Sequence, residues 1–274
     1  MKPLLKWVGG KTQIIDDVLA TFPREIDTYH EPFVGGGSVL FSVLSCADIK
    51  TKRVRASDNN PHLIALYKHV QQDPENLHAA IEHAFKAYDD RTGDDKELFY
   101  YDQRTRYREL PTGCIEKSAL LVFLNKTCFR GLYREGPSGF NVPYGHYKKT
   151  PKWPTLEELT QMQTLLRPVE FTVCDFSEAL SHVDSSRRDF VYADPPYAQE
   201  TKTSFKEYTK GGFDQDRLFK DLQKVKFTMS NANVPCVTES LKEYQIYYVK
   251  ARRAIHSKKP DSTTTEVLVT NRPP

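Results

Sequence analysis

The stretch DFVYADPPY, residues 189–197, decides both the fold class and the chemistry that we expect of this chain. Its first half is apolar and rich in residues that favour strands, so it predicts a buried strand that ends at Asp194. Pro195 and Pro196 follow at once. Because prolines lack N–H donors and have a fixed φ, the carbonyl groups of this turn point in preset directions. An aromatic residue, Tyr197, comes next.

This turn has the groups needed to hold a planar base that carries an amino group. Asp194 and the carbonyl of Pro195 together accept both hydrogens of an exocyclic amine, and the Tyr197 ring stacks on the base. The arrangement suits an amine that must act as a nucleophile although its lone pair is delocalised into a ring. A proline turn that only ends a strand would explain the prolines, but not the acid and the aromatic residue beside them. We therefore interpret 194–197 as a catalytic motif.

Strand signals lie on both sides of a long helical region. Besides 189–194, strand-like runs occur at 53–57, 169–175, 226–231, 245–251 and 266–271. Between residue 61 and about residue 154 there is almost no strand signal, and Asn60-Pro61 and Asp73-Pro74 are each a helix cap followed by proline. The sequence predicts an α/β domain of residues 1–60 and 155–274, interrupted by a helical module at 61–154.

A glycine-rich turn predicts a cofactor site at the edge of the sheet. In EPFVGGGS, residues 31–38, three glycines let the backbone approach a ligand closely, although a tight structural turn is an equally good reading of this segment alone. Asp58 ends a strand about twenty residues later, where an acid commonly binds ribose hydroxyls. The dinucleotide pattern is absent, since Leu40 occupies the place of its third glycine. The pair predicts a site for a cofactor that contains adenosine.

The N-terminal stretch KWVGGKT, residues 6–12, resembles the end of a phosphate-binding loop but lacks the glycine that such a loop requires at position 5, which is Leu5. Nucleoside triphosphate hydrolysis is therefore excluded. The spacing of apolar residues predicts a helix from about residue 11 to residue 22. A lysine in its first turn, Lys11, would oppose the helix dipole, which favours a functional role for it.

Composition adds limits rather than a function. The net charge of +3 indicates no partner by itself, but residues 124–149 and 250–259 are basic segments of the kind that attract a polyphosphate backbone. The five cysteines include no CxxC pair, so we expect no zinc site and no disulfide framework. No apolar run reaches 18 residues and no signal peptide is visible, which predicts an intracellular, soluble protein without a membrane partner.

KWVGGK, the glycine-rich turn, the helical insertion and the DPPY turn follow one another along the chain, and this order resembles that of the Dam-type (D12 class) DNA adenine-N6 methyltransferases. Residues 124–149 are similar to the recognition segment of that family. The resemblance implies a seven-stranded, Rossmann-like methyltransferase sheet with an inserted helical target-recognition domain. It also implies methyl transfer from S-adenosylmethionine to the N6 atom of an adenine flipped out of double-stranded DNA, with no metal and no covalent intermediate.

Site residues follow from this resemblance. The catalytic set is Asp194, Pro195, Pro196 and Tyr197. The cofactor set is Trp7, Lys11, Glu31, Phe33, Gly35, Gly37, Asp58, Asp175, Phe176 and Asp194. The DNA-binding set is Lys126, Phe129, Arg130, Leu132, Arg134, Asn141, Tyr147, Lys148 and Lys149.

Three positions of the DNA-binding set have particular expected roles. Arg134 occupies the place of a guanine-reading arginine, which implies GATC or another short palindrome as the target. Phe129 lies where the family inserts an aromatic residue into the duplex. Arg130 departs from the family, which often has asparagine there. A cognate restriction endonuclease would be a genetic rather than a physical partner.

Two other functions stay open at this point. N4-cytosine methylation uses the same kind of nucleophile, although serine is more usual than aspartate before PPY in those enzymes. A DNA-binding relative without catalysis is the alternative from another class, and the intact motif at 194–197 argues against it.

Overall fold

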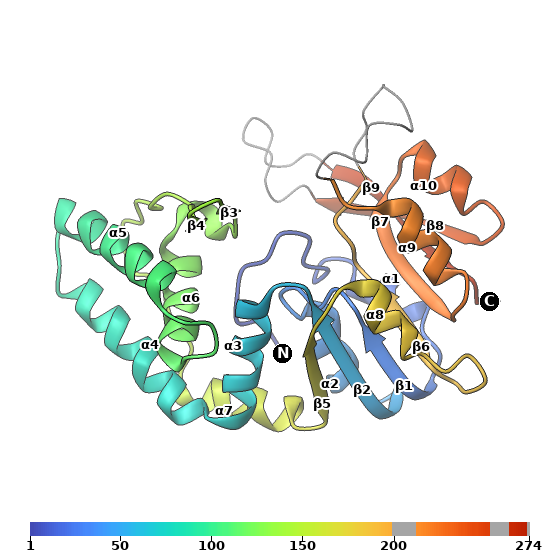
Figure 1. Ribbon diagram of the computed structural model, residues 1–274, viewed down its shortest axis with the longest axis horizontal. Helices are drawn as coiled ribbons and strands as arrows, with labels where there is room; N and C mark the ends of the chain where they lie inside the picture. Colours follow the sequence, from blue (N-terminus) through green and yellow to red (C-terminus); the bar gives the residue numbers. More distant parts are fainter. Residues whose placement is uncertain (199–211, 253–262, 273–274) are drawn as a thin grey trace. The chain divides into compact units, whose positions relative to one another are not determined.

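Most strands of the protein belong to a single mixed sheet. These strands are β1 (Glu25–Glu31), β2 (Lys50–Asp58), β5 (Val169–Val173), β6 (Phe190–Ala193), β7 (Phe227–Ala232), β8 (Gln245–Arg252) and β9 (Thr263–Thr270). The computed structural model describes residues 1–198, 212–252 and 263–272. The seven strands lie in the order β5-β2-β1-β6-β7-β9-β8 (Figure 1). Strands β2, β1, β6 and β7 are parallel, whereas β9 is antiparallel to both β7 and β8.

Helices fill the interval between β2 and β5, as expected. The helices of the described residues are α1 (Ile15–Ala20), α2 (Ser38–Ser45), α3 (Pro61–Gln72), α4 (Pro74–Asp89), α5 (Asp94–Glu109), α6 (Ile115–Thr127), α7 (Leu156–Leu166), α8 (Phe176–Ser181), α9 (Gln215–Leu222) and α10 (Pro235–Ser240). A small hairpin of β3 (Glu135–Gly136) and β4 (Gly139–Phe140) interrupts the helical insertion. The predicted α/β class, with a seven-stranded sheet and an inserted helical segment, is confirmed.

The chain divides into two compact units. The first unit contains residues 1–10, 35–45 and 60–173, and the second contains residues 11–34, 46–59 and 174–274. The helical insertion therefore belongs to the first unit, and the DPPY turn belongs to the second.

In the first unit, α6 is the central helix. Its residues from Lys117 to Asn125 are all buried, and α3, α4 and α5 pack against it. Figure 1 shows α4, α5 and α6 side by side. The two predicted caps are present: Asn60 accepts hydrogen bonds from the first turn of α3, and Asp73 accepts one from Asn76 in α4. Asn60 therefore begins α3 shortly after β2, and Asp73 both ends α3 and begins α4.

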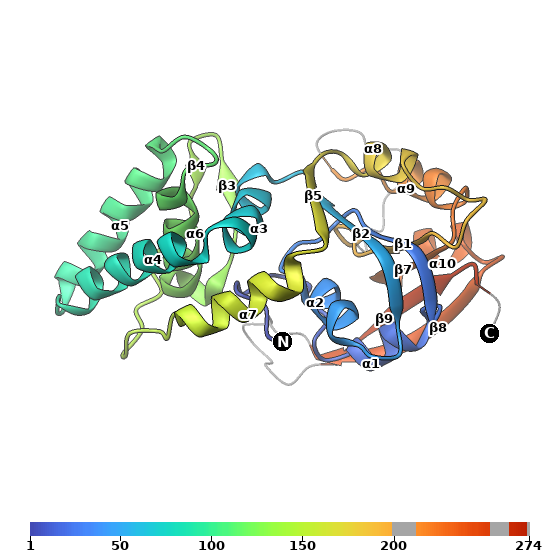
Figure 2. The same ribbon diagram turned by 90° about the horizontal axis from the view of Figure 1, so that it is seen from below.

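In the second unit, helices cover both faces of the strands. On one face, Val191, Phe227 and Val267 belong to a core that α8, α9 and α10 complete with their own apolar residues. Figure 2 shows α8 and α9 next to each other on this face. On the other face, Phe22, which follows α1 in the sequence, packs against the rings of Phe190 and Tyr192. Burial on both faces explains why the β6 segment reads as a continuous apolar run in the sequence.

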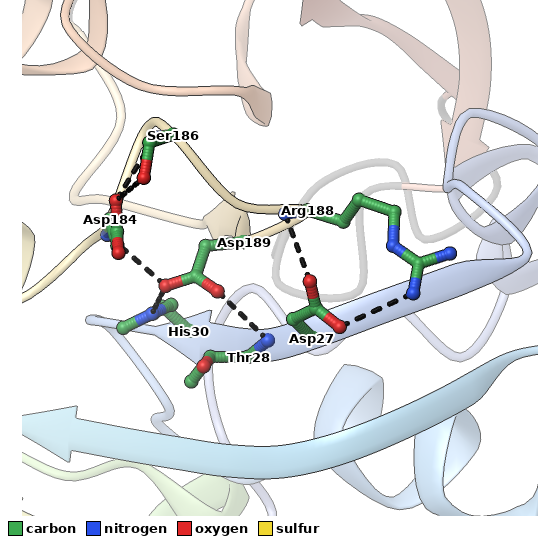
Figure 3. A network of polar contacts seen from close by, with 7 residues as sticks. All are labelled: Asp27, Thr28, His30, Asp184, Ser186, Arg188 and Asp189. Atoms are coloured by element: carbon green, nitrogen blue, oxygen red, sulfur yellow. Dashed lines mark hydrogen bonds and ion pairs between the residues drawn. The ribbon is translucent and has the colours of Figure 1, made fainter.

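The central strand β1 was not among the predicted strand runs, because its sequence EIDTYHE is mostly polar. Six of its seven residues are nevertheless buried. Figure 3 shows how the polar groups are satisfied: Asp189 accepts hydrogen bonds from the backbone N–H groups of Thr28 (3.0 Å) and Asp184 (3.1 Å) and contacts His30 Nε2 at 3.4 Å. Long-range partners, invisible to a local pattern, make this strand possible.

Candidate active site and recognition segment

Asp194 follows β6 directly, at the end of a strand whose four residues are all buried. Lys11 Nζ donates to its Oδ2 atom at 2.6 Å. Burial raises the pKa of Asp194, the ammonium of Lys11 opposes this rise, and the negative charge of Glu266 adds to it. The side chain of Asp194 is 20% exposed, so a ligand can reach a carboxylate that is otherwise enclosed.

Lys11 lies before the first helix rather than in it. Helix α1 begins at Ile15, so the expected helix of residues 11–22 is shorter than predicted and Lys11 does not oppose a first-turn dipole. The backbone carbonyl of Lys11 accepts a hydrogen bond from the Ile14 N–H at 3.0 Å. The side chain is 2% exposed, and its Nζ atom lies 5.0 Å from the centre of the Tyr197 ring. Lys11 therefore contacts two residues of the DPPY turn.

Two buried amides hold the backbone of this turn. Gln215 Nε2 donates to the carbonyl of Pro196 at 2.7 Å, and Asn231 Oδ1 accepts from the N–H of Ala198 at 3.0 Å. Asn231 Nδ2 also donates to Gln215 Oε1 at 3.3 Å. Sequence analysis missed both residues. The signal was present in β7, where Asn231 ends a strand-like run that is otherwise suited to a core.

Acidic residues gather at the same edge of the sheet. Glu31 ends β1 and Asp58 ends β2, and these strands are parallel neighbours, so both acids lie at the carboxyl edge from which Asp194 also emerges. Glu31 Oε2 accepts a hydrogen bond from Tyr29 Oη at 2.6 Å, which fixes the orientation of this buried carboxylate. The placement of Asp58 agrees with the pattern that predicted it.

Aromatic rings stand beside these acids in the second unit. The rings of Phe33 and Phe176 lie 5.6 Å apart. The Asp175 carboxylate accepts a hydrogen bond from the backbone N–H of Ser177, in the first turn of α8, and forms an ion pair with Arg217 at 2.8 Å. Its carboxylate thus has two partners, while the Phe33–Phe176 pair offers apolar surface.

The remaining predicted cofactor residues belong to the first unit. A Cβ atom on Gly36 would lie 2.7 Å from the Trp7 Cβ, and one on Gly37, which has φ +74°, would lie 2.7 Å from Tyr67 Oη. Tyr67 Oη donates to the carbonyl of Gly35 at 2.8 Å. Close packing within the first unit therefore requires glycine at these positions of the turn. Trp7 also stacks on Tyr133, with ring centres 5.1 Å apart.

Comparison with known proteins identifies the family. Residues 7–255 match the family of D12 class N6 adenine-specific DNA methyltransferases. The chain belongs to this family. It is 38% identical to the type II methyltransferase M.MjaIII of Methanocaldococcus jannaschii, over 99% of each chain. It is 30% identical to M1.LlaDCHI of Lactococcus lactis subsp. cremoris (99% and 95% covered) and to the DNA adenine methylase of Haemophilus influenzae (93% and 87% covered).

Membership in the D12 class makes this chain an adenine-specific DNA methyltransferase and implies a methyl donor. Among the described residues, no group of three or more His, Cys, Asp or Glu side chains is arranged to hold a metal ion. No helix of the described chain is both long and apolar enough to cross a membrane.

The segment predicted to recognise the target, residues 124–149, begins in the last turn of α6 and continues beyond it. Phe129, in a short 3-10 turn (Phe129–Gly131), is 44% exposed, and the Arg130 guanidinium lies 5.1 Å from the centre of its ring. Leu132 is half-buried. Arg134 is exposed and donates from Nε to Asn141 Oδ1 at 2.7 Å.

The basic residues of this segment differ in their surroundings. Lys148 and Lys149 are exposed. Lys126 is half-buried, and burial together with the nearby Lys6 ammonium lowers its pKa. Tyr147 Oη donates to the carbonyl of Cys128 at 3.1 Å. Of the other basic segment, 250–259, residues 253–259 lie outside the described residues.

Arg130 has φ 58°, in the left-handed region. Glycine enters this region freely and asparagine more readily than other residues. Arg130 therefore adopts this backbone at a cost in strain, and the asparagine that the resemblance implies for this position would enter it at a lower cost.

Proposed function

We propose that this protein transfers a methyl group from S-adenosylmethionine to the N6 atom of an adenine flipped out of duplex DNA. The observation that carries the proposal is the DPPY turn: Asp194 is paired with the buried Lys11 at 2.6 Å, and Tyr197 stands beside it on a turn held by two buried amides. Few arrangements other than the capture of a planar, amine-bearing ligand require an acid, a rigid carbonyl and an aromatic ring together.

The residues of this turn would act by positioning. Asp194 and the Pro195 carbonyl accept the two amine hydrogens, which holds the nitrogen lone pair toward the methyl group. Burial raises the pKa of Asp194, which makes its carboxylate a stronger acceptor for these hydrogens, and the Lys11 ammonium opposes this rise. Tyr197 stacks on the base.

Residues of the second unit fit a nucleoside-containing methyl donor. Asp58 and Glu31 offer carboxylates to ribose hydroxyls, and the Phe33–Phe176 pair offers apolar surface to an adenine ring. In the first unit, Cβ atoms on Gly36 and Gly37 would meet Trp7 and Tyr67, so the glycine turn presents backbone rather than side chain. S-adenosylmethionine supplies an activated methyl group, so the protein itself needs no covalent step. Lys11, Asp175 and Phe176 complete the proposed cofactor set.

We further propose that residues 61–154 are the target-recognition domain and that the target is GATC or a similar short palindrome. The exposed Phe129 ring would fill the space that the adenine leaves. Arg134, oriented by Asn141, would read a guanine, and Arg130, Leu132 and Tyr147 belong to the same proposed DNA-binding set. Lys126, Lys148 and Lys149 would bind phosphates. A restriction endonuclease of the same specificity would be its genetic partner.

Methylome sequencing of DNA from cells that express the chain tests base, position and target together. Asp194→Ala should fold, since the change lies at a strand end, and lose nearly all methylation, whereas Asp58→Ala should weaken S-adenosylmethionine binding in calorimetry. Methylated cytosine would overturn the adenine assignment, and full activity of Asp194→Ala would overturn the mechanism. Complete lack of methylation by the wild-type chain would leave a DNA-binding protein only.

Base flipping has its own test. Extrusion costs a few kcal/mol because the adenine is paired and stacked in the duplex. With 2-aminopurine in place of the target adenine, we expect a large rise in fluorescence on binding. Normal methylation of the ordinary duplex without any rise would count against extrusion.

A further inference from the structure

Glu266 is a carboxylate in an inner strand of the sheet. It lies on β9, between β7 and β8, where its backbone is opposite Ala232 and Val249. The three residues after it are fully buried valines and leucine. Glutamate is disfavoured in strands and is rarely enclosed without a partner. Its presence here requires a reason.

The reason lies in the DPPY turn. Tyr197 Oη donates to Glu266 Oε2 at 2.7 Å. Burial, followed by the charges of Asp194 and Glu266, raises the pKa of Tyr197 well above its ordinary value, so the phenol stays protonated and remains the donor. A hydrogen bond to an ionised acceptor is about twice as strong as one between neutral groups.

The hydrogen bonds that hold the backbone of the turn do not fix the orientation of the Tyr197 ring. Gln215 binds the carbonyl before this residue, and Asn231 binds the N–H after it. Both hold main chain, whereas the second side-chain torsion of tyrosine is broad. Lys11 contacts the face of the ring, and Glu266 holds its tip. A ring held at its tip cannot swing about its first torsion without breaking that bond.

We propose that Glu266 is a positioning residue that fixes the ring of Tyr197 on which the target base stacks. This inference rests on the proposed function. If the ring tilts, the base stacked on it no longer presents its amine nitrogen in line with the methyl group. A misplacement of about 1 Å lowers the rate on the order of 100-fold. Loss of Glu266 therefore acts on the chemical step more than on binding.

A double-mutant cycle tests the proposal. Glu266→Ala should lower kcat about tenfold, with the S-adenosylmethionine Kd and the DNA KM changed less than twofold. Tyr197→Phe keeps the ring but removes the same hydrogen bond, so we expect a similar loss. The double variant should be no worse than either single variant, because both changes break one interaction. Glu266→Gln should retain most activity, since its amide oxygen still accepts the phenol hydrogen.

Gln245→Ala is the matched control. On the edge strand β8, Gln245 Oε1 accepts from Tyr247 Oη at 2.9 Å, which is also a bond from a tyrosine hydroxyl to a side-chain oxygen, but with a neutral acceptor and at an exposed place. This variant should keep wild-type kcat. Wild-type kcat in Glu266→Ala, multiplied losses in the double variant, or no rescue by Glu266→Gln would each overturn the proposal. If Glu266→Ala does not fold, Tyr197→Phe and Glu266→Gln decide the question.

A second readout does not depend on activity. In a crystal structure of Glu266→Ala, the Tyr197 ring should leave its wild-type orientation, and in Glu266→Gln it should keep it. An unchanged ring in Glu266→Ala overturns the inference whether or not the chain methylates DNA. Absence of methylation by the wild-type chain, in contrast, overturns the proposed function alone.

Discussion

Arg134 and Lys148 are exposed cations of one segment, but their chemistry differs. Arg134 is oriented by two bonds to Asn141, one from Nε to Oδ1 at 2.7 Å and one to the backbone carbonyl at 3.3 Å. A planar guanidinium held in place suits the paired acceptors of guanine. Lys148 carries a point charge on a flexible stem, which suits phosphate.

The two roles separate by experiment. Arg134→Ala should relax discrimination at one base pair, by about 1–3 kcal/mol against the correct target. Lys148→Ala should weaken binding to all duplexes alike and flatten the salt dependence by about one unit of slope. Binding to target and single-substituted duplexes over a series of salt concentrations measures both. If Arg134→Ala weakened binding to all duplexes equally, the assignment of Arg134 to guanine recognition would be wrong.

Arg130 allows a test of backbone strain. A residue with a Cβ atom costs roughly 1–2 kcal/mol in the left-handed region. Arg130→Ala and Arg130→Gly both remove the guanidinium, but only the second removes the Cβ atom. Urea unfolding should show Arg130→Gly to be more stable than Arg130→Ala by about 1 kcal/mol. Equal stabilities would show that the turn carries no strain.

At the scale of elements, one amide ties α6 to two other segments. Asn125 is fully buried; its Oδ1 accepts from the Lys6 N–H at 2.8 Å, and its Nδ2 donates to the carbonyls of Lys6 (2.9 Å) and Gly131 (3.0 Å). Gly131 fits because a Cβ there would lie 2.5 Å from the Lys6 side chain. The N-terminal segment and the recognition turn are thereby held to one helix.

Replacement of this amide should cost more than an ordinary polar substitution. Asn125→Leu keeps the volume but leaves three backbone groups without their partner, and each costs about 1–3 kcal/mol when buried. Thr127→Val is the control, since the Thr127 hydroxyl bonds only to the Phe123 carbonyl of its own helix. Unfolding in urea should show a loss of several kcal/mol for the first, about 1 kcal/mol or less for the second. Similar losses in the two variants would show that the hydrogen bonds of Asn125 to Lys6 and Gly131 stabilise the fold no more than one ordinary side-chain hydrogen bond.

Sequence reasoning succeeded for elements with local signals and failed where partners are distant. The β6 strand and the caps at Asn60 and Asp73 were correctly predicted because apolar runs and Asn-Pro or Asp-Pro pairs are local patterns. Strand β1 was not predicted because Thr28 and His30 find their partner in Asp189, about 160 positions away. Gln215, Asn231 and Glu266 were missed for the same reason.

At the scale of the whole molecule, the buried network of Figure 3 makes stability depend on pH. Burial lowers the pKa of His30 below its ordinary value of 6.5, although Asp189 opposes this. Between the lowered pKa and 6.5, the unfolded chain binds a proton at this residue that the folded chain does not. Stability therefore falls as pH drops below about 6.5.

His30→Gln should reduce this slope. Burial also lowers the pKa values of His62 and His69, so the slope should shrink without vanishing. Urea unfolding followed by circular dichroism between pH 5 and pH 8 measures it, with the exposed His83→Gln as control. An unchanged slope in His30→Gln would show that His30 takes up its proton equally in both states.

The ion pair between Lys11 and Asp194 joins residues that are 183 positions apart. During synthesis, Lys11 leaves the ribosome long before its counter-ion exists, and contacts of such separation form late and slowly. Strand β8 is made before β9 and yet borders only β9, so it has no place in the sheet until the last strand arrives. Glu266, on that strand, then reaches Tyr197. A nascent chain should thus fold its helices early and become able to modify DNA only after β9 has been made.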